Sequence, residues 1–89
     1  MKIVLNKDYG GFSVSDYVRD TLDLEDNYSA DRKDPRLIKL IEDFPDRCDG
    51  TFATLKIVEI PDEATDYYIS DYDGLETIIY VINGKLYLK

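Results

Sequence analysis

The clearest pattern along the chain is an amphipathic helix near its middle. Asp34 followed by Pro35 is typical of a helix N-cap and first position, and Pro45 ends the pattern. A shorter helix is predicted from Asp16 to Leu22, after a serine N-cap at position 13 or 15. Both helices are expected to pack on a sheet. The apolar residues that form one face of the longer helix are Leu37, Ile38, Leu40, Ile41 and Phe44.

Elsewhere the hydrophobic residues follow the period of two that is typical of strands. Asp73-Gly74 and Asn83-Gly84 separate the last three such segments, and both dipeptides favour tight hairpin turns because their residues tolerate positive φ. The sequence therefore predicts a single α+β domain over residues 1–89, with two short helices packed on a mainly antiparallel sheet of four to five strands that ends in a β-hairpin. The predicted strands are Lys2–Asn6, Thr51–Ile60, Tyr67–Tyr72, Thr77–Ile82 and Lys85–Leu88.

The net charge of −8 argues against direct binding to nucleic acid, because nucleic-acid binders gain affinity by placing Lys and Arg against phosphates. The chain has no His and a single cysteine, Cys48, so it has neither an internal disulfide nor the usual zinc ligands. No apolar run approaches the ~20 residues of a membrane span, and the N-terminal segment is too short for a secretory signal. We therefore expect a protein of the reducing cytoplasm, without a membrane contact or a cofactor.

The candidate catalytic and ligand-binding groups are sparse. A thiol nucleophile at Cys48 would lack a His base, so we expect no enzymatic activity. The segment Asp71–Glu76 contains a D-x-D-G kernel that resembles part of a calcium loop, but Asp73-Gly74 is explained by a turn, and no metal site is expected. Gly10-Gly11 has the layout of a phosphate loop, and we favour a plain connection between a strand and a helix.

The most informative segment runs from Ile57 to Gly84 and contains seven carboxylates but no Lys or Arg. Such a run repels nucleic acid and attracts basic proteins. Tyrosines alternate with these carboxylates; they are common in recognition surfaces, although β-propensity explains exposed tyrosines equally well. We expect the chain to act by contact with a protein that has a basic surface. The residues expected to make this contact are Glu59, Asp62, Glu63, Asp66, Tyr67, Tyr68, Asp71, Tyr72, Asp73 and Glu76.

Four segments of the chain carry a resemblance to known proteins. They are the stretch from Lys2 to Ser15 with its Gly10-Gly11 pair, Asp31-Arg32-Lys33-Asp34-Pro35-Arg36-Leu37-Ile38, Leu55 to Asp62, and Tyr72-Asp73-Gly74-Leu75-Glu76. Together they resemble a family of small bacteriophage and prophage proteins without an assigned activity. The resemblance implies a phage origin and the cytoplasm of a host cell, and it implies no catalytic residues. The chain departs from the family after Glu76, where the segment Thr77–Lys89 forms a predicted hairpin in place of a polar, often Trp-containing ending.

Two functions from different classes follow. In the first, the protein is a phage-encoded inhibitor whose carboxylates imitate phosphates and occupy the basic channel of a host nucleic-acid-binding defence protein, as anti-CRISPR proteins of the DNA-mimic type do. Its partner would be a CRISPR effector or another host nuclease. In the second, it is a small non-enzymatic phage accessory protein that assembles through its hairpin edge or an apolar sheet face, as a homodimer or as a subunit of a complex. The acidity would then only maintain solubility.

Overall fold

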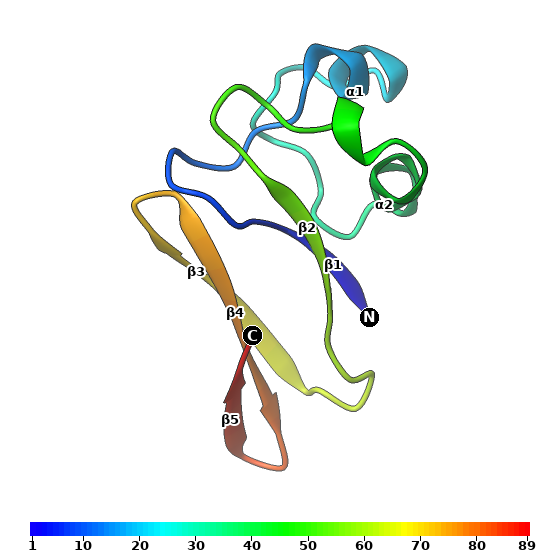
Figure 1. Cartoon of the computed structure of the whole chain (residues 1–89). Coiled ribbons are helices and arrows are strands. Elements are labelled where there is room, and N and C mark those ends of the chain that lie inside the picture. Colours follow the sequence, from blue (N-terminus) through cyan, green and yellow to red (C-terminus); the bar gives the residue numbers. More distant parts are fainter.

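The computed structural model describes residues 1–89, and the fold is α+β, as predicted. The strands form two antiparallel sheets, β1–β2 and β3–β4–β5, where a single sheet had been expected (Figure 1). In chain order the elements are β1 (Lys2–Asn6), α1 (Asp16–Thr21), α2 (Pro35–Asp43), a 3₁₀ turn η1 (Pro45–Arg47), β2 (Leu55–Glu59), β3 (Asp66–Tyr72), β4 (Leu75–Ile82) and β5 (Lys85–Leu88).

The two sheets and the helices form three layers, with β1–β2 in the middle (Figure 1). Alternate residues of a strand point to opposite faces, so β1 supplies side chains to two separate hydrophobic cores. Val4 packs in the core that contains the helices. Ile3 and Leu5 pack in the core shared with β4. All three side chains are fully buried, which explains why one short strand can hold both outer layers.

Both helices begin at the caps that the sequence predicts. The Val18 backbone N–H donates to Ser15 Oγ at 3.2 Å, which selects Ser15 as the N-cap of α1. The Arg36 backbone N–H donates to Asp34 Oδ1 at 2.9 Å at the start of α2. Hydrogen bonds from Arg36 hold the pKa of Asp34 below its usual value, so this cap stays charged near neutral pH.

The second strand is shorter than predicted. The range Thr51–Ile60 was predicted, and β2 covers Leu55–Glu59. The Ala53 N–H donates to Gly50 O in a turn, and Asp49 Oδ1 accepts from the Leu55 N–H, so the β-branched residues before Leu55 are in a loop. The two predicted hairpin turns are confirmed, since Asp73, Gly74, Asn83 and Gly84 all have positive φ, between 51° and 89°.

A buried ion pair joins the three layers. Glu76 on β4 is 3% exposed, and it accepts two hydrogen bonds from the Arg32 guanidinium, at 2.7 and 2.8 Å. The same carboxylate accepts the Asn6 backbone N–H of β1 at 2.8 Å. Arg32, in the connection between α1 and α2, also donates to Val4 O and stacks 3.5 Å from the centroid of the Phe12 ring. One carboxylate therefore contacts β1, β4 and the connection between the helices.

The turn between β3 and β4 is held against β1 and the glycine pair. The buried Asn6 amide donates to Gly74 O at 2.6 Å, and the Gly10 N–H donates to Asp73 O at 3.0 Å. A Cβ atom on Gly74 would lie 2.1 Å from the Gly11 nitrogen, so this close approach requires glycine.

Replacing Glu76 with Ala leaves the Arg32 guanidinium and the Asn6 N–H without their acceptor, and we expect the free energy of unfolding to fall by about 3–5 kcal/mol. Urea denaturation followed by far-UV circular dichroism measures this change. The exposed Glu63→Ala is the matched control and should stay within about 0.5 kcal/mol of the parent. A loss below about 1 kcal/mol in the Glu76 variant would show that the ion pair does not hold the layers together.

Candidate interaction surfaces

One face of the β3–β4–β5 sheet packs on the middle layer, and the other face is open. Ile78 and Tyr80 of β4 are buried in the second core, so the neighbours that alternate with them point outward. The strand register places the outward residues of β3 and β5 beside them. We call this surface the outer sheet face; its members are Asp66, Tyr68, Ser70, Tyr72, Leu75, Thr77, Ile79, Val81, Leu86 and Leu88.

The outer sheet face is largely apolar. Tyr68 and Tyr72 are 51% and 75% exposed, and Leu86 and Leu88 are 69% and 67% exposed. Asp66 is its only charged member. In addition, β5 is an edge strand with no neighbour on its outer side (Figure 1). A contiguous apolar surface of this kind is typical of a protein–protein contact.

Two of the predicted contact tyrosines lie on this face, and the third does not. Tyr68 and Tyr72 point outward, whereas Tyr67 is paired with Tyr80, is half-buried and faces the inner side of the sheet. The Lys33 ammonium lies 5.6 Å from the centroid of the Tyr67 ring. Leu86 and Leu88 were not among the predicted contact residues, although their alternation with Lys85 and Tyr87 indicated a two-sided strand and an apolar sheet face was one of the expected assembly surfaces.

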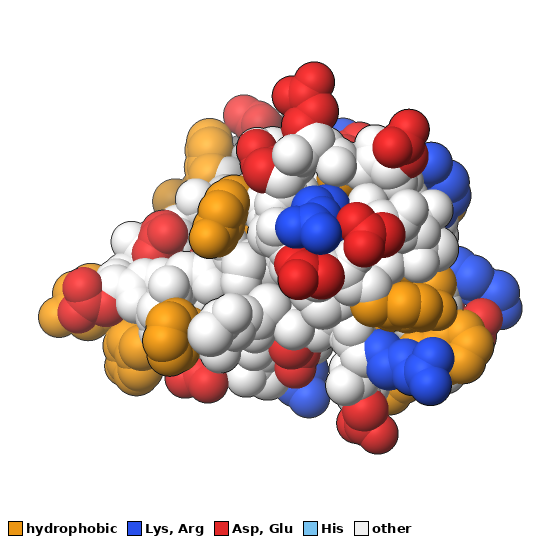
Figure 2. All heavy atoms as spheres, turned by 90° about the horizontal axis from the view of Figure 1, so that it is seen from above, with side chains coloured by type: hydrophobic (Ala, Val, Ile, Leu, Met, Phe, Trp, Pro, Cys, Tyr) orange, Lys and Arg blue, Asp and Glu red, His pale blue; other side chains and the backbone are white.

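The predicted carboxylates do not form one patch. Asp66 and Asp71 lie at opposite ends of β3, about 17 Å apart at the usual rise of a strand. Glu59 lies on the helix-facing side of β2, as the partner of Lys2 in the ladder. In Figure 2, acidic side chains are dispersed among Lys, Arg and hydrophobic side chains. At physiological salt, charges so far apart act nearly independently.

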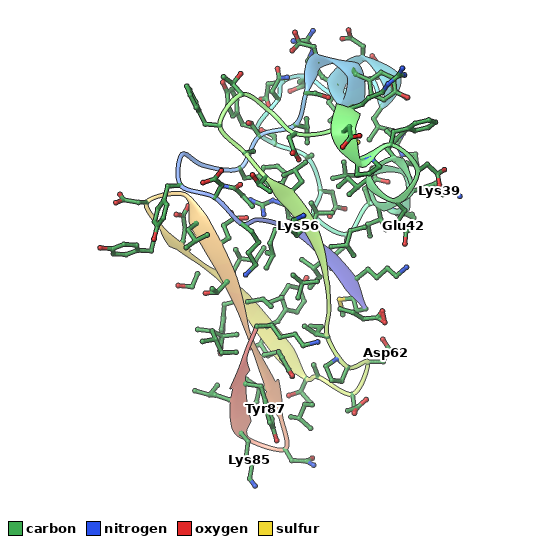
Figure 3. All side chains as sticks on the ribbon, viewed as in Figure 1. Lys39, Glu42, Lys56, Asp62, Lys85 and Tyr87 are labelled. Carbon is green, nitrogen blue, oxygen red and sulfur yellow. The ribbon has the colours of Figure 1, made fainter.

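Several of these carboxylates have partners within the chain. Glu76 is buried in its ion pair with Arg32, so its assignment to a contact surface is wrong. Asp71 Oδ1 accepts the Gly74 N–H at 2.7 Å and so belongs to the turn. Asp62, in the loop between β2 and β3 (Figure 3), lies 2.8 Å from the N-terminal ammonium, whose hydrogen bond lowers the pKa of Asp62. Glu63, Asp66 and Asp73 remain exposed.

A groove of about 840 Å³ lies near the start of α1, between residues 10–17 and 49–52. Its aromatic side chains are Phe12, Tyr17, Tyr28 and Phe52, of which Tyr28 and Phe52 are 71% and 70% exposed. Asn27 also lines the groove. Gly10-Gly11 lines the groove, and the residues that line it include neither Lys nor Arg. Such a lining gives a phosphate group no cationic partner.

Cys48 is fully buried and donates a hydrogen bond to Phe44 O at 3.2 Å. Burial, and to a smaller extent the neighbouring charge of Asp49, raise the pKa of the Cys48 thiol. A raised pKa lowers the thiolate fraction that nucleophilic attack requires. No group of three or more Cys, Asp or Glu side chains is arranged to hold a metal ion. None of the helices is long and apolar enough to cross a membrane.

In comparisons with protein-family models, curated proteins and solved structures, nothing matches this chain. The surfaces of the chain itself are therefore the basis for its proposed function.

The Cys48 thiol should react with a disulfide reagent such as DTNB at least about tenfold more slowly in the folded protein than in urea, because it is inaccessible and its pKa is raised. The release of thionitrobenzoate at pH 8 measures both rates, with free cysteine as the reference. A folded-state rate equal to that of free cysteine would show an accessible, reactive thiol.

Proposed function

We propose that this chain is a non-enzymatic phage accessory protein that assembles by packing its outer sheet face against the same face of a second copy. The observation that carries the proposal is the uncovered apolar face with Tyr68, Tyr72, Leu86 and Leu88 at its surface. Two sheets that pack face to face, about 10 Å apart, are the ordinary way to cover such surfaces. The resemblance to small bacteriophage proteins is consistent with a role in a phage complex.

The charge distribution favours a second copy as the occupant. Each copy has a net charge of −8, so two copies repel each other over most of their surfaces. The outer sheet face is where this repulsion is weakest, since Asp66 is its only charge and sits at one end of β3. The outer sheet face offers almost no carboxylates to a partner with a basic surface, so burying that partner's charges there would cost free energy. An apolar face of a second copy has no such desolvation cost.

The size of the face is sufficient for a modest interface. Strand spacing and rise give three strands of this length a face of roughly 15 by 25 Å. Burying it on both copies covers roughly 750 Å² of projected area, and somewhat more accessible surface because side chains project from it. This is below the ~1,200–2,000 Å² of stable interfaces and is typical of weak ones, so we expect a dimer of low affinity.

Sedimentation equilibrium of the parent protein should show a dimer at tens of micromolar, and Leu86→Lys with Leu88→Lys should make it a monomer because four buried ammonium groups would face each other. Tyr68→Lys, on β3, should act in the same direction and does not disturb β5. The matched control is Phe52→Lys, which adds charge at an exposed aromatic outside the face and should leave the dimer intact. A parent monomer at all concentrations, or variants with unchanged mass, would refute the assembly.

A second candidate function is the inhibition of a host nucleic-acid-binding defence protein. It is favoured by an acidic corner formed by Asp62 (Figure 3) and Glu63 in the loop between β2 and β3 and by Asp66 at the start of β3, all of them exposed. It ranks second because a nucleic-acid mimic needs a continuous anionic surface, and Asp71 and Asp73 lie at the far end of the hairpin.

If this second function holds, the protein should displace a fluorescent DNA duplex from a purified CRISPR effector, with an affinity that falls steeply as salt rises. Replacing Asp62, Glu63 and Asp66 with Lys should abolish displacement. Replacing Asp20, Glu25 and Asp46 with Lys makes the same change in net charge on exposed positions elsewhere and should reduce displacement only slightly. Equal losses in both triple variants would mean that no defined acidic site exists.

A further inference from the structure

We infer that the groove beside α1 is a second binding site, which takes an extended peptide carrying a Lys or Arg side chain. No residue of β3, β4 or β5 lines this groove, so it is separate from the outer sheet face. Its volume of about 840 Å³ is large enough for several peptide residues. Its charge, its aromatic side chains and its backbone each indicate the same class of ligand.

The charged groups of the groove are both acidic. Asp16 and Asp49 line it, and each has one carboxylate oxygen fixed by the fold. Asp49 Oδ1 accepts the Leu55 N–H at 2.8 Å, and Asp16 Oδ1 lies 3.0 Å from the Asn27 amide and 3.2 Å from the Arg19 guanidinium. The second oxygen of each carboxylate has no partner within the chain, so both can accept from a cationic ligand.

Aromatic rings provide surfaces for the same cation. Tyr28 and Phe52 are each about 70% exposed and lie along the groove, although the interior of the protein would normally hold such rings. A guanidinium or ammonium over an aromatic face gains a cation–π attraction, and its methylene stem packs on apolar surface. Two other rings of the groove already have guanidinium groups of the chain beside them: Arg32 lies 3.5 Å from the centroid of Phe12, and Arg47 lies 5.6 Å from that of Tyr17. Tyr28 and Phe52 are therefore the rings that a ligand cation can use.

The backbone of the groove is suited to pairing with a peptide strand. Val14 and Asp49 form an isolated antiparallel bridge, and the pairing stops after the Gly50 N–H donates to Ser13 O. Beyond it, the N–H groups of Gly11, Phe12 and Ser13 have no partner within the chain. Successive N–H groups of an extended segment point to opposite edges, so an added strand can hydrogen bond with alternate ones of these groups, either Phe12 or the pair Gly11 and Ser13.

The Ser13 side chain gives an independent indication of a ligand. Ser13 is 9% exposed, and its hydroxyl makes no hydrogen bond within the chain. No fully buried side-chain oxygen in the protein is left unsatisfied, so this hydroxyl retains some solvent access, and Ser13 lines the groove. A nearly buried hydroxyl that faces a groove without a partner is suited to a polar group of a ligand.

The test uses the ¹⁵N-labelled full chain and the peptide acetyl-Ala-Arg-Ala-Arg-Ala-amide as the probe. A titration followed by NMR should give saturable shifts of the amide signals of residues 10–17 and 49–52. The control peptide has citrulline in place of each Arg, which keeps the shape and removes the charge, and it should bind at least about tenfold more weakly. Equal binding of the two peptides, or shifts that do not saturate and follow exposed carboxylates such as Glu63, would overturn the inference.

Phe52→Ala should weaken binding of the arginine peptide about five- to tenfold, because it removes one ring from the groove. Tyr72→Ala removes an equally exposed ring from the outer sheet face and should leave peptide affinity unchanged. Equal affinity of the two variants for the arginine peptide would contradict a binding site in the groove. Sedimentation of the same samples distinguishes the groove from the outer sheet face, since Phe52→Ala should not alter the assembly state.

Discussion

The ion pair between Arg32 and Glu76 is the contact on which the three layers depend. A buried carboxylate is costly unless its oxygens are satisfied, and here Arg32 and the Asn6 N–H satisfy them together. This requirement fixes the position of β4 relative to β1 across the interface between the two sheets. It also brings together Asn6, Gly10-Gly11, Arg32 and Gly74, which all lie in or beside this network. Asn6, Arg32 and Gly74 therefore have structural roles, whereas Gly10 and Gly11 also line the groove beside α1.

Features set by neighbouring residues could be predicted from the sequence. The caps at Ser15 and Asp34 and the turns at Asp73-Gly74 and Asn83-Gly84 depend on local backbone preferences, and all of them are confirmed. The division of the strands into two stacked sheets could not be predicted. It depends on Glu76 meeting Arg32, 44 residues earlier, and no local pattern encodes such a contact.

The surfaces were predicted less well than the elements, for a related reason. The number of carboxylates suggested a single acidic patch, but the number alone does not say where each side chain points. Asp66 and Asp71 lie at opposite ends of β3, and because side chains alternate along a strand they point to opposite faces of the sheet. Tyr68 and Tyr72, which were predicted as contact residues, are exposed on the outer sheet face. Leu86 and Leu88 were not predicted as contact residues, although an apolar sheet face was one of the expected assembly surfaces. Which face of the strands stays open depends on how the layers pack, and no local pattern encodes this packing.

The central position of β1 determines when the chain can fold during its synthesis. Lys2 pairs with Glu59, and Ile3 and Leu5 pack against Ile78, so β1 leaves the ribosome well before the strands that it packs against. Contacts so distant in sequence carry a large loop-closure cost and slow folding. Until β4 has emerged, Ile3 and Leu5 of β1 stay uncovered, which makes this interval the one most open to chaperones and to misassociation.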